Sequence, residues 1–268
     1  MLGPLFLALL AADENANLRG SWVTDSDLPA LTRQVGLKRI DLSLTRISDQ
    51  GLLQLKGLTG IEELNLRFAE LITDEGMSVV KTWKSLKRID LRATKITDTT
   101  LGYLGGLPNL ESVDVGFAQV TDNGIELLTT LPKLKHLMIG GNKLTDTGLQ
   151  ALRLMPTLES LDISGPQRTD SGLWSVSLTA KGIGAIASLS NLKELRIGGT
   201  SITAAGLEEL RKALPKLERL SLHRAKRIED PAIEVLKKWP SLKEVDVNET
   251  KVTAEALKAL PAAIIVRH

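Results

Sequence analysis

The sequence VTDNGIELLTTLPKLKHL at residues 120–137 recurs in closely similar form, LTDTGLQALRLMPTLESL, at residues 144–161. Aligning every copy on its first strand-like apolar residue gives nine repeats, spaced by 24 or 25 residues except for one interval of 34. Their first residues are Leu37, Ile61, Leu86, Leu110, Leu134, Leu158, Leu192, Leu217 and Leu242. Self-similarity at this period is typical of a solenoid, because one unit cannot bury its apolar face alone and neighbours must share a core.

Each repeat begins with a strand-like segment, as in LKRIDL at residues 37–42. Apolar residues stand at its first, fourth and sixth positions, and the last two alternate with polar residues, which predicts a short strand with one buried face. No hairpin signal separates the repeats, so the strands should be parallel. Because strands are about 4.8 Å apart and helices about 10 Å apart, the stack should bend with its strands inside. The sequence thus predicts a right-handed α/β solenoid, a horseshoe with a parallel inner sheet and outer helices.

A hydroxyl residue followed by aspartate marks the expected start of most helices, as in Thr97-Asp98 and Thr121-Asp122. The hydroxyl can accept from free backbone N–H groups, and the carboxylate favours the positive end of the helix. A glycine follows three residues after the hydroxyl, although glycine destabilises a helix by about 1 kcal/mol. Its recurrence predicts that neighbouring helices crowd together there. These glycines are Gly51, Gly76, Gly124, Gly148 and Gly206.

The pattern LxxLxLxxTxITDxGLxxLxxLPxL resembles the leucine-rich repeats of the cysteine-containing subtype, familiar from F-box leucine-rich-repeat proteins and from many bacterial proteins. The resemblance covers Leu37 to about Leu260. The family usually has Cys or Asn at the ninth position, which here is Thr45, Ala69, Thr94, Ala118, Asn142, Pro166, Thr200, Ala225 or Thr250. The resemblance implies protein recognition through the inner face, usually without catalysis. We expect no F-box-like helical segment before the repeats, which argues against a ubiquitin-ligase adaptor, the alternative function.

The remaining residues define the expected boundaries. Residues 1–12, MLGPLFLALLAA, are too short for a membrane span of about 20 residues but are similar to the apolar region of a secretory signal. The alternative is an apolar segment folded over the first repeat. Residues 13–36 are expected to form an N-terminal cap, residues 37–260 the nine repeats, and residues 261–268 a last partial strand. We therefore expect a secreted or periplasmic protein without a membrane span, with a cytoplasmic location as the alternative.

The sixth repeat is ten residues too long. Its helix could begin at residues 168–170 or at Leu178-Thr179, so RTDSGLWSVS, residues 168–177, is interpreted as an inserted near-duplicate of the helix opening. We expect it on the loop that leaves the sixth strand, since insertions tend to lie on one face, often the binding face. Trp174 belongs to no repeat column and is a candidate anchor for a partner. The alternative is that its ring packs back onto a helix.

Composition limits the chemistry. The chain has no cysteine, which excludes disulfides and thiolate sites, and its formal charge of +2 argues against nucleic-acid binding. His136 and His223 lie three repeats apart, too far to share a metal. Asp90 and Asp114 on adjacent strands could form a carboxylate pair, but pairing with neighbouring arginines is the simpler explanation. We therefore expect no enzyme, no cofactor and no metal site.

The expected binding face carries the third, fifth and seventh residues of each strand, because side chains alternate along a strand. The fifth position forms a mostly acidic column: Asp41, Asn65, Asp90, Asp114, Met138, Asp162, Arg196, Ser221 and Asp246. The eighth position holds Leu44, Phe68, Ala93 and Phe117, followed by Gly141, Gly165 and Gly199. Arginine with aromatic residues is typical of an interface centre, although the rings could instead turn inward and close the core.

These residues predict a non-catalytic, monomeric scaffold that binds a protein partner through its concave face, with a regulatory or ubiquitin-ligase-type adaptor as the alternative. The expected partner-binding residues are Arg67, Phe68, Arg92, Phe117 and Trp174. The sequence does not indicate which protein binds.

Overall fold

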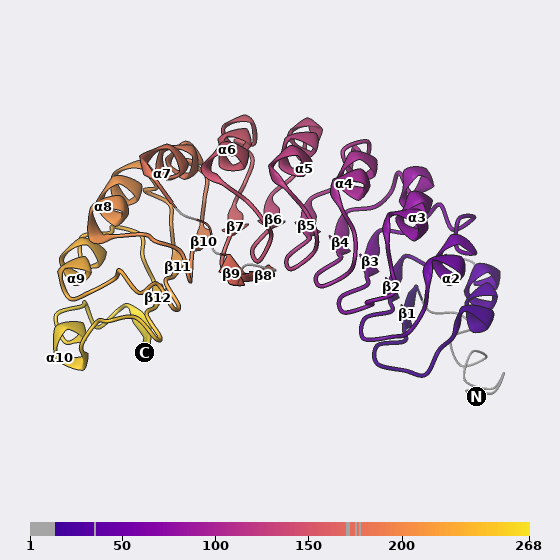
Figure 1. The fold of residues 1–268 in the computed structure, drawn as a ribbon, viewed down its shortest axis with the longest axis horizontal. Coiled ribbons are helices and arrows are strands. Elements are labelled where there is room, and N and C mark those ends of the chain that lie inside the picture. The colour runs from indigo at the N-terminus through magenta and orange to yellow at the C-terminus, as the bar shows by residue number, and fades with distance from the viewer. Residues whose placement is uncertain (1–13, 35, 170–171, 175, 177) are drawn as a thin grey trace. The chain divides into compact units, whose positions relative to one another are not determined.

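The computed structural model describes residues 14–34, 36–169, 172–174, 176 and 178–268. The chain forms two compact units, which we call unit 1 (Met1–Leu134) and unit 2 (Lys135–His268). In each unit the strands of the main sheet pair in parallel in sequence order, and the helices line one side of that sheet (Figure 1). None of the helices in the described residues is long and apolar enough to cross a membrane.

Unit 1 contains five parallel strands in its described residues, each three residues long. They are β1 (Asn15–Asn17), β2 (Arg39–Asp41), β3 (Glu63–Asn65), β4 (Arg88–Asp90) and β5 (Ser112–Asp114). The helical segments between and after them are η1 (Asp25–Arg33), α2 (Asp49–Leu53), α3 (Asp74–Met77), η2 (Ser78–Thr82), α4 (Asp98–Leu104), α5 (Asp122–Leu127) and η3 (Leu128–Thr130), the η elements being 3-10 helices. Each strand starts at the third position of its repeat, so the pairing register repeats the sequence alignment.

The described part of unit 2 has the same architecture with six parallel strands. They are β6 (His136–Met138), β7 (Ser160–Asp162), β10 (Glu194–Arg196), β11 (Arg219–Ser221), β12 (Glu244–Asp246) and β13 (Ile265–Arg267). Its helical segments are α6 (Asp146–Leu149), η4 (Gln150–Leu154), α7 (Ala180–Ala187), α8 (Ala204–Ala213), α9 (Pro231–Leu236) and α10 (Ala254–Leu257). The strand-then-helix order and parallel pairing predicted from the sequence are therefore confirmed.

The insertion in the sixth repeat folds differently from its sequence pattern. Residues 167–174 contribute β8 (Gln167–Thr169) and β9 (Gly172–Trp174), which pair antiparallel as a hairpin on the loop that follows β7. The described residues of this segment form a hairpin rather than a helix start, and α7 begins after Thr179. Thr179 caps α7 and also donates to Asp146, the helix-start aspartate of the preceding repeat. That pairing selects the later of the two possible helix starts.

The helix-start aspartates join successive repeats. Asp49 accepts from the backbone N of Thr73 at 2.8 Å and from its hydroxyl at 2.6 Å. Asp74 makes the same pair of bonds to Thr97, at 2.9 and 2.6 Å. The hydroxyl of Thr73 also accepts from the N–H of Glu75, so it caps its own helix as predicted. Each carboxylate therefore stabilises the helix start of the next repeat rather than only its own.

The recurring glycine makes room for this carboxylate. A Cβ on Gly76 would lie 2.9 Å from the Cα of Asp49 and still nearer its carboxylate. Gly51, Gly124 and Gly182 would clash in the same way with the aspartate of the preceding repeat. The predicted crowding is thus confirmed at these positions, and the group responsible is a carboxylate.

The core is aliphatic and continuous within each unit. The first, fourth and sixth strand positions are buried in every repeat, as Leu37, Ile40 and Leu42 illustrate. Trp83 and Trp239 occupy equivalent positions and are both buried. The polar ninth-position residues Thr45 and Thr94 each donate to a backbone carbonyl three residues earlier, at 2.7 Å. Burial of the hydroxyl is therefore compensated by a hydrogen bond.

Candidate interaction surface

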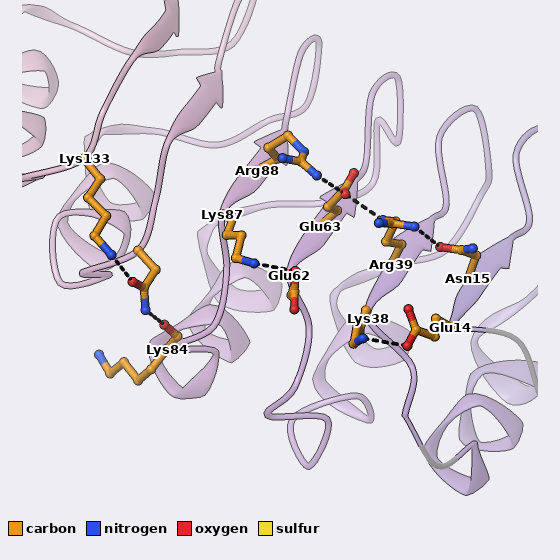
Figure 2. A network of polar contacts seen from close by, with 11 residues as sticks. Glu14, Asn15, Lys38, Arg39, Glu62, Glu63, Lys84, Lys87, Arg88 and Lys133 are labelled. Carbon is orange, nitrogen blue, oxygen red and sulfur yellow. Dashed lines mark hydrogen bonds and ion pairs between the residues drawn. The ribbon is translucent and has the colours of Figure 1, made fainter. Parts of the chain in front are cut away.

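The charges near the start of the strands in unit 1 pair with one another. Lys38 contacts Glu14 at 2.6 Å and Lys87 contacts Glu62 at 2.7 Å. Figure 2 shows that Arg39 and Arg88 both reach Glu63 from neighbouring strands. The hydrogen bond from Lys87 keeps the pKa of Glu62 below its usual value. Since these ion pairs are made within the chain, this end of the sheet is a mosaic of compensated charges.

The other end of the strands is built from turns. Asp41, Asn65 and Asp90 each use one side-chain oxygen to accept the backbone N–H two residues later, at 2.9 to 3.0 Å. Asp114 accepts from Gly116 in the same way at 2.8 Å. Asp and Asn favour turns because they can bond to their own backbone. The acidic column seen in the sequence therefore has a structural role at the strand ends.

Asp90 and Asp114, the possible carboxylate pair, both accept backbone hydrogen bonds in these turns. Burial raises the pKa of Asp90 and outweighs the opposing hydrogen bond from the Arg92 backbone and the charges of Arg67 and Arg92. Asp114 lies 3.7 Å from the guanidinium of Arg92. In the described residues, no group of three His, Cys, Asp or Glu side chains could hold a metal ion. The charge pairing expected at Asp114 is present, and both carboxylates have partners within the chain.

The eighth position of each repeat has a left-handed backbone. In unit 1 the φ angles are 58° at Leu44, 58° at Phe68, 59° at Ala93 and 55° at Phe117. This conformation costs a non-glycine residue about 1–2 kcal/mol. Unit 2 has glycine in its first three repeats at this position, namely Gly141, Gly165 and Gly199. Unit 1 thus retains large side chains where glycine would be unstrained.

These side chains are exposed. Leu44, Phe68 and Phe117 have relative exposures of 47%, 42% and 40%. The guanidinium carbon of Arg92 lies 4.5 Å from the ring centroid of Phe117, and that of Arg67 lies 5.4 Å from that of Phe68. Both are cation–π distances. The rings therefore do not turn into the core, and each is covered on one side by an arginine.

The two arginine–phenylalanine pairs extend over three successive repeats, the second to the fourth. The backbone N of Phe68 donates to the carbonyl of Arg92 at 2.9 Å, and the N of Ala93 donates to Gly116 at 2.8 Å. The structure thus brings together four of the residues expected to bind a partner, at the C-terminal ends of the strands of unit 1. They are Arg67, Phe68, Arg92 and Phe117. We call them the arginine–phenylalanine surface.

The fifth expected residue belongs to unit 2. Trp174 is the last residue of β9, and its side chain lies outside the part of the structure that is described. Its role remains a prediction. The histidines lie in the same unit: His136 begins β6, and His223 follows β11 with its Nε2 3.7 Å from Glu249.

A hollow that the repeat pattern does not predict lies beside the arginine–phenylalanine surface. It has a volume of about 570 Å³ and lies between the loops that follow β2 and β3. Its lining residues are Leu44, Thr45, Arg46, Phe68, Glu70 and Leu71. Leu71 is 49% exposed. The second repeat has 25 residues rather than 24, and that extra residue in the loop was the signal that could have revealed it.

Comparison with known proteins agrees with this architecture. A family model described as "Leucine Rich repeat" matches residues 59–80, 106–128 and 130–152. No curated protein matches the chain. Internalin F from Listeria monocytogenes has a similar structure, with a TM-score of 0.65 and 22% identity, over 92% of this chain and 71% of that one. Internalin C2 of the same organism has a TM-score of 0.55 and 24% identity, covering 90% and 80%.

A third similar structure is a complex of TLR13 with ssRNA13, with a TM-score of 0.56 and 18% identity over 86% of this chain and 35% of that one. The repeats, the parallel sheets and these matches identify leucine-rich repeats in the chain, and the predicted right-handed α/β solenoid class is confirmed.

Proposed function

We propose that this protein is a non-catalytic scaffold that binds a protein partner through the open face of its sheet, meaning the face away from the helices. The arginine–phenylalanine surface would form the centre of the interface in unit 1, and Trp174 would be a further anchor in unit 2. The observation that carries the proposal is the exposure of Phe68 and Phe117 on strained backbone beneath arginines. Strain and exposed aromatic area are both typical of binding sites.

Photo-crosslinking tests this proposal. A photoreactive phenylalanine analogue at position 68 or 117 should capture the same protein in the native host. The same analogue at Leu127, which is 42% exposed on α5, serves as the control from the helical side of unit 1. If a host protein is captured from position 127 but not from position 68 or 117, the interface lies on the helical side instead.

Truncation of an anchor then measures its contribution. Phe117→Ala should weaken binding of the captured partner about 30-fold, because a central aromatic anchor contributes about 2 kcal/mol or more. Leu127→Ala should change affinity less than about threefold, since it lies away from the proposed interface. Thermal unfolding of both variants checks that the fold is retained. Unchanged affinity for a folded Phe117→Ala protein would remove Phe117 from the interface.

An adaptor of a regulatory or ubiquitin-ligase-type complex is the alternative within the same class. Its support is the resemblance of the repeats to those of F-box proteins. The two functions differ in what is captured: ligase-core subunits would support the adaptor, whereas a cell-envelope protein would support the exported scaffold.

We do not propose binding to nucleic acid, although one similar structure is named as an RNA complex. Asp41, Asp90 and Asp114 lie among the cations of the open face and would repel phosphates. The net charge of +2 is also small for such a role.

Export and a monomeric state are further parts of the proposal. The support for export is the apolar sequence of residues 1–12, which lies outside the described residues. Mass spectrometry of the protein from its host should find a chain that begins at Asp13. Retention of the first twelve residues in the cytoplasmic fraction would contradict export, and light scattering at twice the mass of 29.0 kDa would contradict the monomer.

A further inference from the structure

We propose that the partner presents an acidic segment with one large apolar side chain, and that this side chain enters the hollow between Leu44, Phe68 and Leu71. This inference rests on the proposed function and specifies the chemistry of what binds there.

Three of the six lining residues of the hollow are exposed apolar side chains. Leu44, Phe68 and Leu71 have relative exposures of 47%, 42% and 49% and come from two successive repeats. Its volume of about 570 Å³ lies within the range of about 300–1,000 Å³ found for ligand pockets. An apolar side chain with part of its backbone would bury these three residues together.

The walls of the hollow are held by backbone hydrogen bonds. The N–H of Leu44 donates to the carbonyl of Arg67 at 2.8 Å, and the N–H of Phe68 donates to that of Arg92 at 2.9 Å. The loops are therefore in place before a partner binds, and little ordering entropy is lost on binding. A preformed hollow suits a short extended segment, which itself must be ordered when it binds.

The backbone strain supports a binding role for these side chains. Leu44 and Phe68 have φ angles of 58°, while the equivalent positions in three repeats of unit 2 are glycine. Glycine would relieve the strain and would also remove exposed apolar surface. Retention of a strained, exposed leucine and phenylalanine at adjacent turns is thus better explained by contact with another molecule than by folding.

The charges around the hollow indicate an acidic partner. Four cations stand at the seventh and tenth positions of the first three repeats: Arg46, Arg67, Arg92 and Lys95. Arg46 lines the hollow, and Arg67 and Arg92 lie over the rings of Phe68 and Phe117. The tenth position of the second repeat is the anion Glu70. Arg46, Arg67 and Lys95 form no ion pair with any residue that the structure describes.

This arrangement contrasts with the start of the strands, where lysines and glutamates compensate one another (Figure 2). The fifth-position carboxylates compensate the cations only in part, since each holds one oxygen in a turn and Asp114 is already shared with Arg92. Carboxylates that flank an apolar side chain would meet the remaining cations. A nucleic acid would meet the same cations but has no side chain for an apolar hollow.

Peptide selection on the full chain provides the test. Random dodecapeptides displayed on phage are selected against the purified protein, and the enriched peptide is titrated by fluorescence polarisation. We expect enriched sequences to combine one Leu, Ile, Phe or Trp with two or more Asp or Glu residues. Enrichment of basic or wholly polar peptides, or no enrichment above the starting library, would overturn the inference.

Two matched pairs of variants locate the bound peptide. Leu71→Glu should weaken binding about 30-fold, whereas Leu154→Glu, at a leucine 67% exposed in unit 2, should leave it unchanged. Arg46→Glu should weaken it about tenfold or more at low salt, whereas Lys56→Glu makes the same charge change outside the hollow and should have little effect. Equal effects within either pair would overturn the inference.

The outcomes separate this inference from the proposed function. If peptide binding depends on Phe117 but not on Leu71 or Arg46, the arginine–phenylalanine surface remains the interface and the hollow is not occupied. If a single-stranded RNA oligonucleotide competes fully with the peptide, the cations serve a nucleic acid and the acidic-segment chemistry is wrong. If binding depends on none of these residues, both proposals fail.

Discussion

The eighth position of the repeat shows how a single residue affects the stability of a turn. Every repeat turns there through a left-handed backbone, which glycine adopts without strain and other residues adopt at a cost. Unit 2 uses glycine in its first three repeats, whereas unit 1 uses leucine, phenylalanine or alanine. The fold accepts either, and the strain is not confined to unit 1, because Arg224 and Glu249 in unit 2 have φ angles of 62° and 56° at the same position.

Substitutions at this position should therefore change stability in opposite directions. Ala93→Gly should stabilise the protein by about 0.5–1 kcal/mol, because relief of strain exceeds the added entropy of the unfolded chain. Gly199→Ala should destabilise it by about 1 kcal/mol, although its added Cβ would meet nothing closer than 3.7 Å. Urea midpoints measure both effects. A lower midpoint for Ala93→Gly would show that the turn is not strained.

At the scale of the element, the helix start depends on the preceding repeat. The carboxylate of Asp74 accepts from the backbone and hydroxyl of Thr97 and from the hydroxyl of Thr100 at 2.5 Å. Thr100 stands where most other repeats have glycine, and its hydroxyl donates to the carboxylate for which glycine makes room elsewhere. A helix of four to seven residues, as these are in unit 1, is too short to be stable alone. The link between repeats therefore fixes where each helix begins.

Acid should weaken this link. Burial raises the pKa of Asp74, but the hydrogen bonds from Thr100 and Thr97 outweigh it, so its pKa in the folded protein is lowered. Because the unfolded pKa is about 3.9, the stabilisation is complete above that pH and is lost as pH falls through the lower folded pKa. Asp74→Asn should thus be less stable than the parent at about pH 6, and the gap in urea midpoints should narrow towards about pH 2.5. A gap that stays constant would show that ionisation of Asp74 is unimportant.

The same link explains what the sequence could and could not predict. Repeat periodicity predicts the strands, the helix starts and the buried columns, because each depends on local residue patterns. The pattern RTDSGL at residues 168–173 carries the same local signals, yet it contributes to a hairpin. The position of the helix start depends on a residue distant in sequence, because Asp146 accepts a hydrogen bond from Thr179 across the insertion. The exposure of Phe68 and the hollow beside Leu71 likewise depend on turn geometry and on a neighbouring repeat, which one repeat pattern does not contain.

At the scale of the whole molecule, the second position of the repeat alternates in charge. From the first repeat to the ninth it reads Lys38, Glu62, Lys87, Glu111, Lys135, Glu159, Lys193, Glu218 and Lys243. Neighbours pair in both units, as in Glu62–Lys87 at 2.7 Å and Glu159–Lys193 at 2.6 Å. If a strand skipped one repeat and paired with the next, like charges would face each other. Nine nearly identical strands offer many wrong pairings, and the alternation disfavours every slip by one repeat.

Reversal of one charge should expose this effect. Lys87→Glu would place three successive carboxylates along the second position, with Glu62 before and Glu111 after it. We expect a lower urea midpoint and slower refolding at low ionic strength. In the native register the new carboxylate would be repelled by Glu62 and Glu111. In a register slipped by one repeat it would no longer face a like charge. Both differences from the parent should disappear at about 1 M salt, where the Debye length is about 3 Å. Lys56→Glu, which makes the same charge change away from the strands, should refold like the parent at both salt concentrations. If the two variants refold equally, the alternation contributes only surface charge and the register is set by the buried leucines alone.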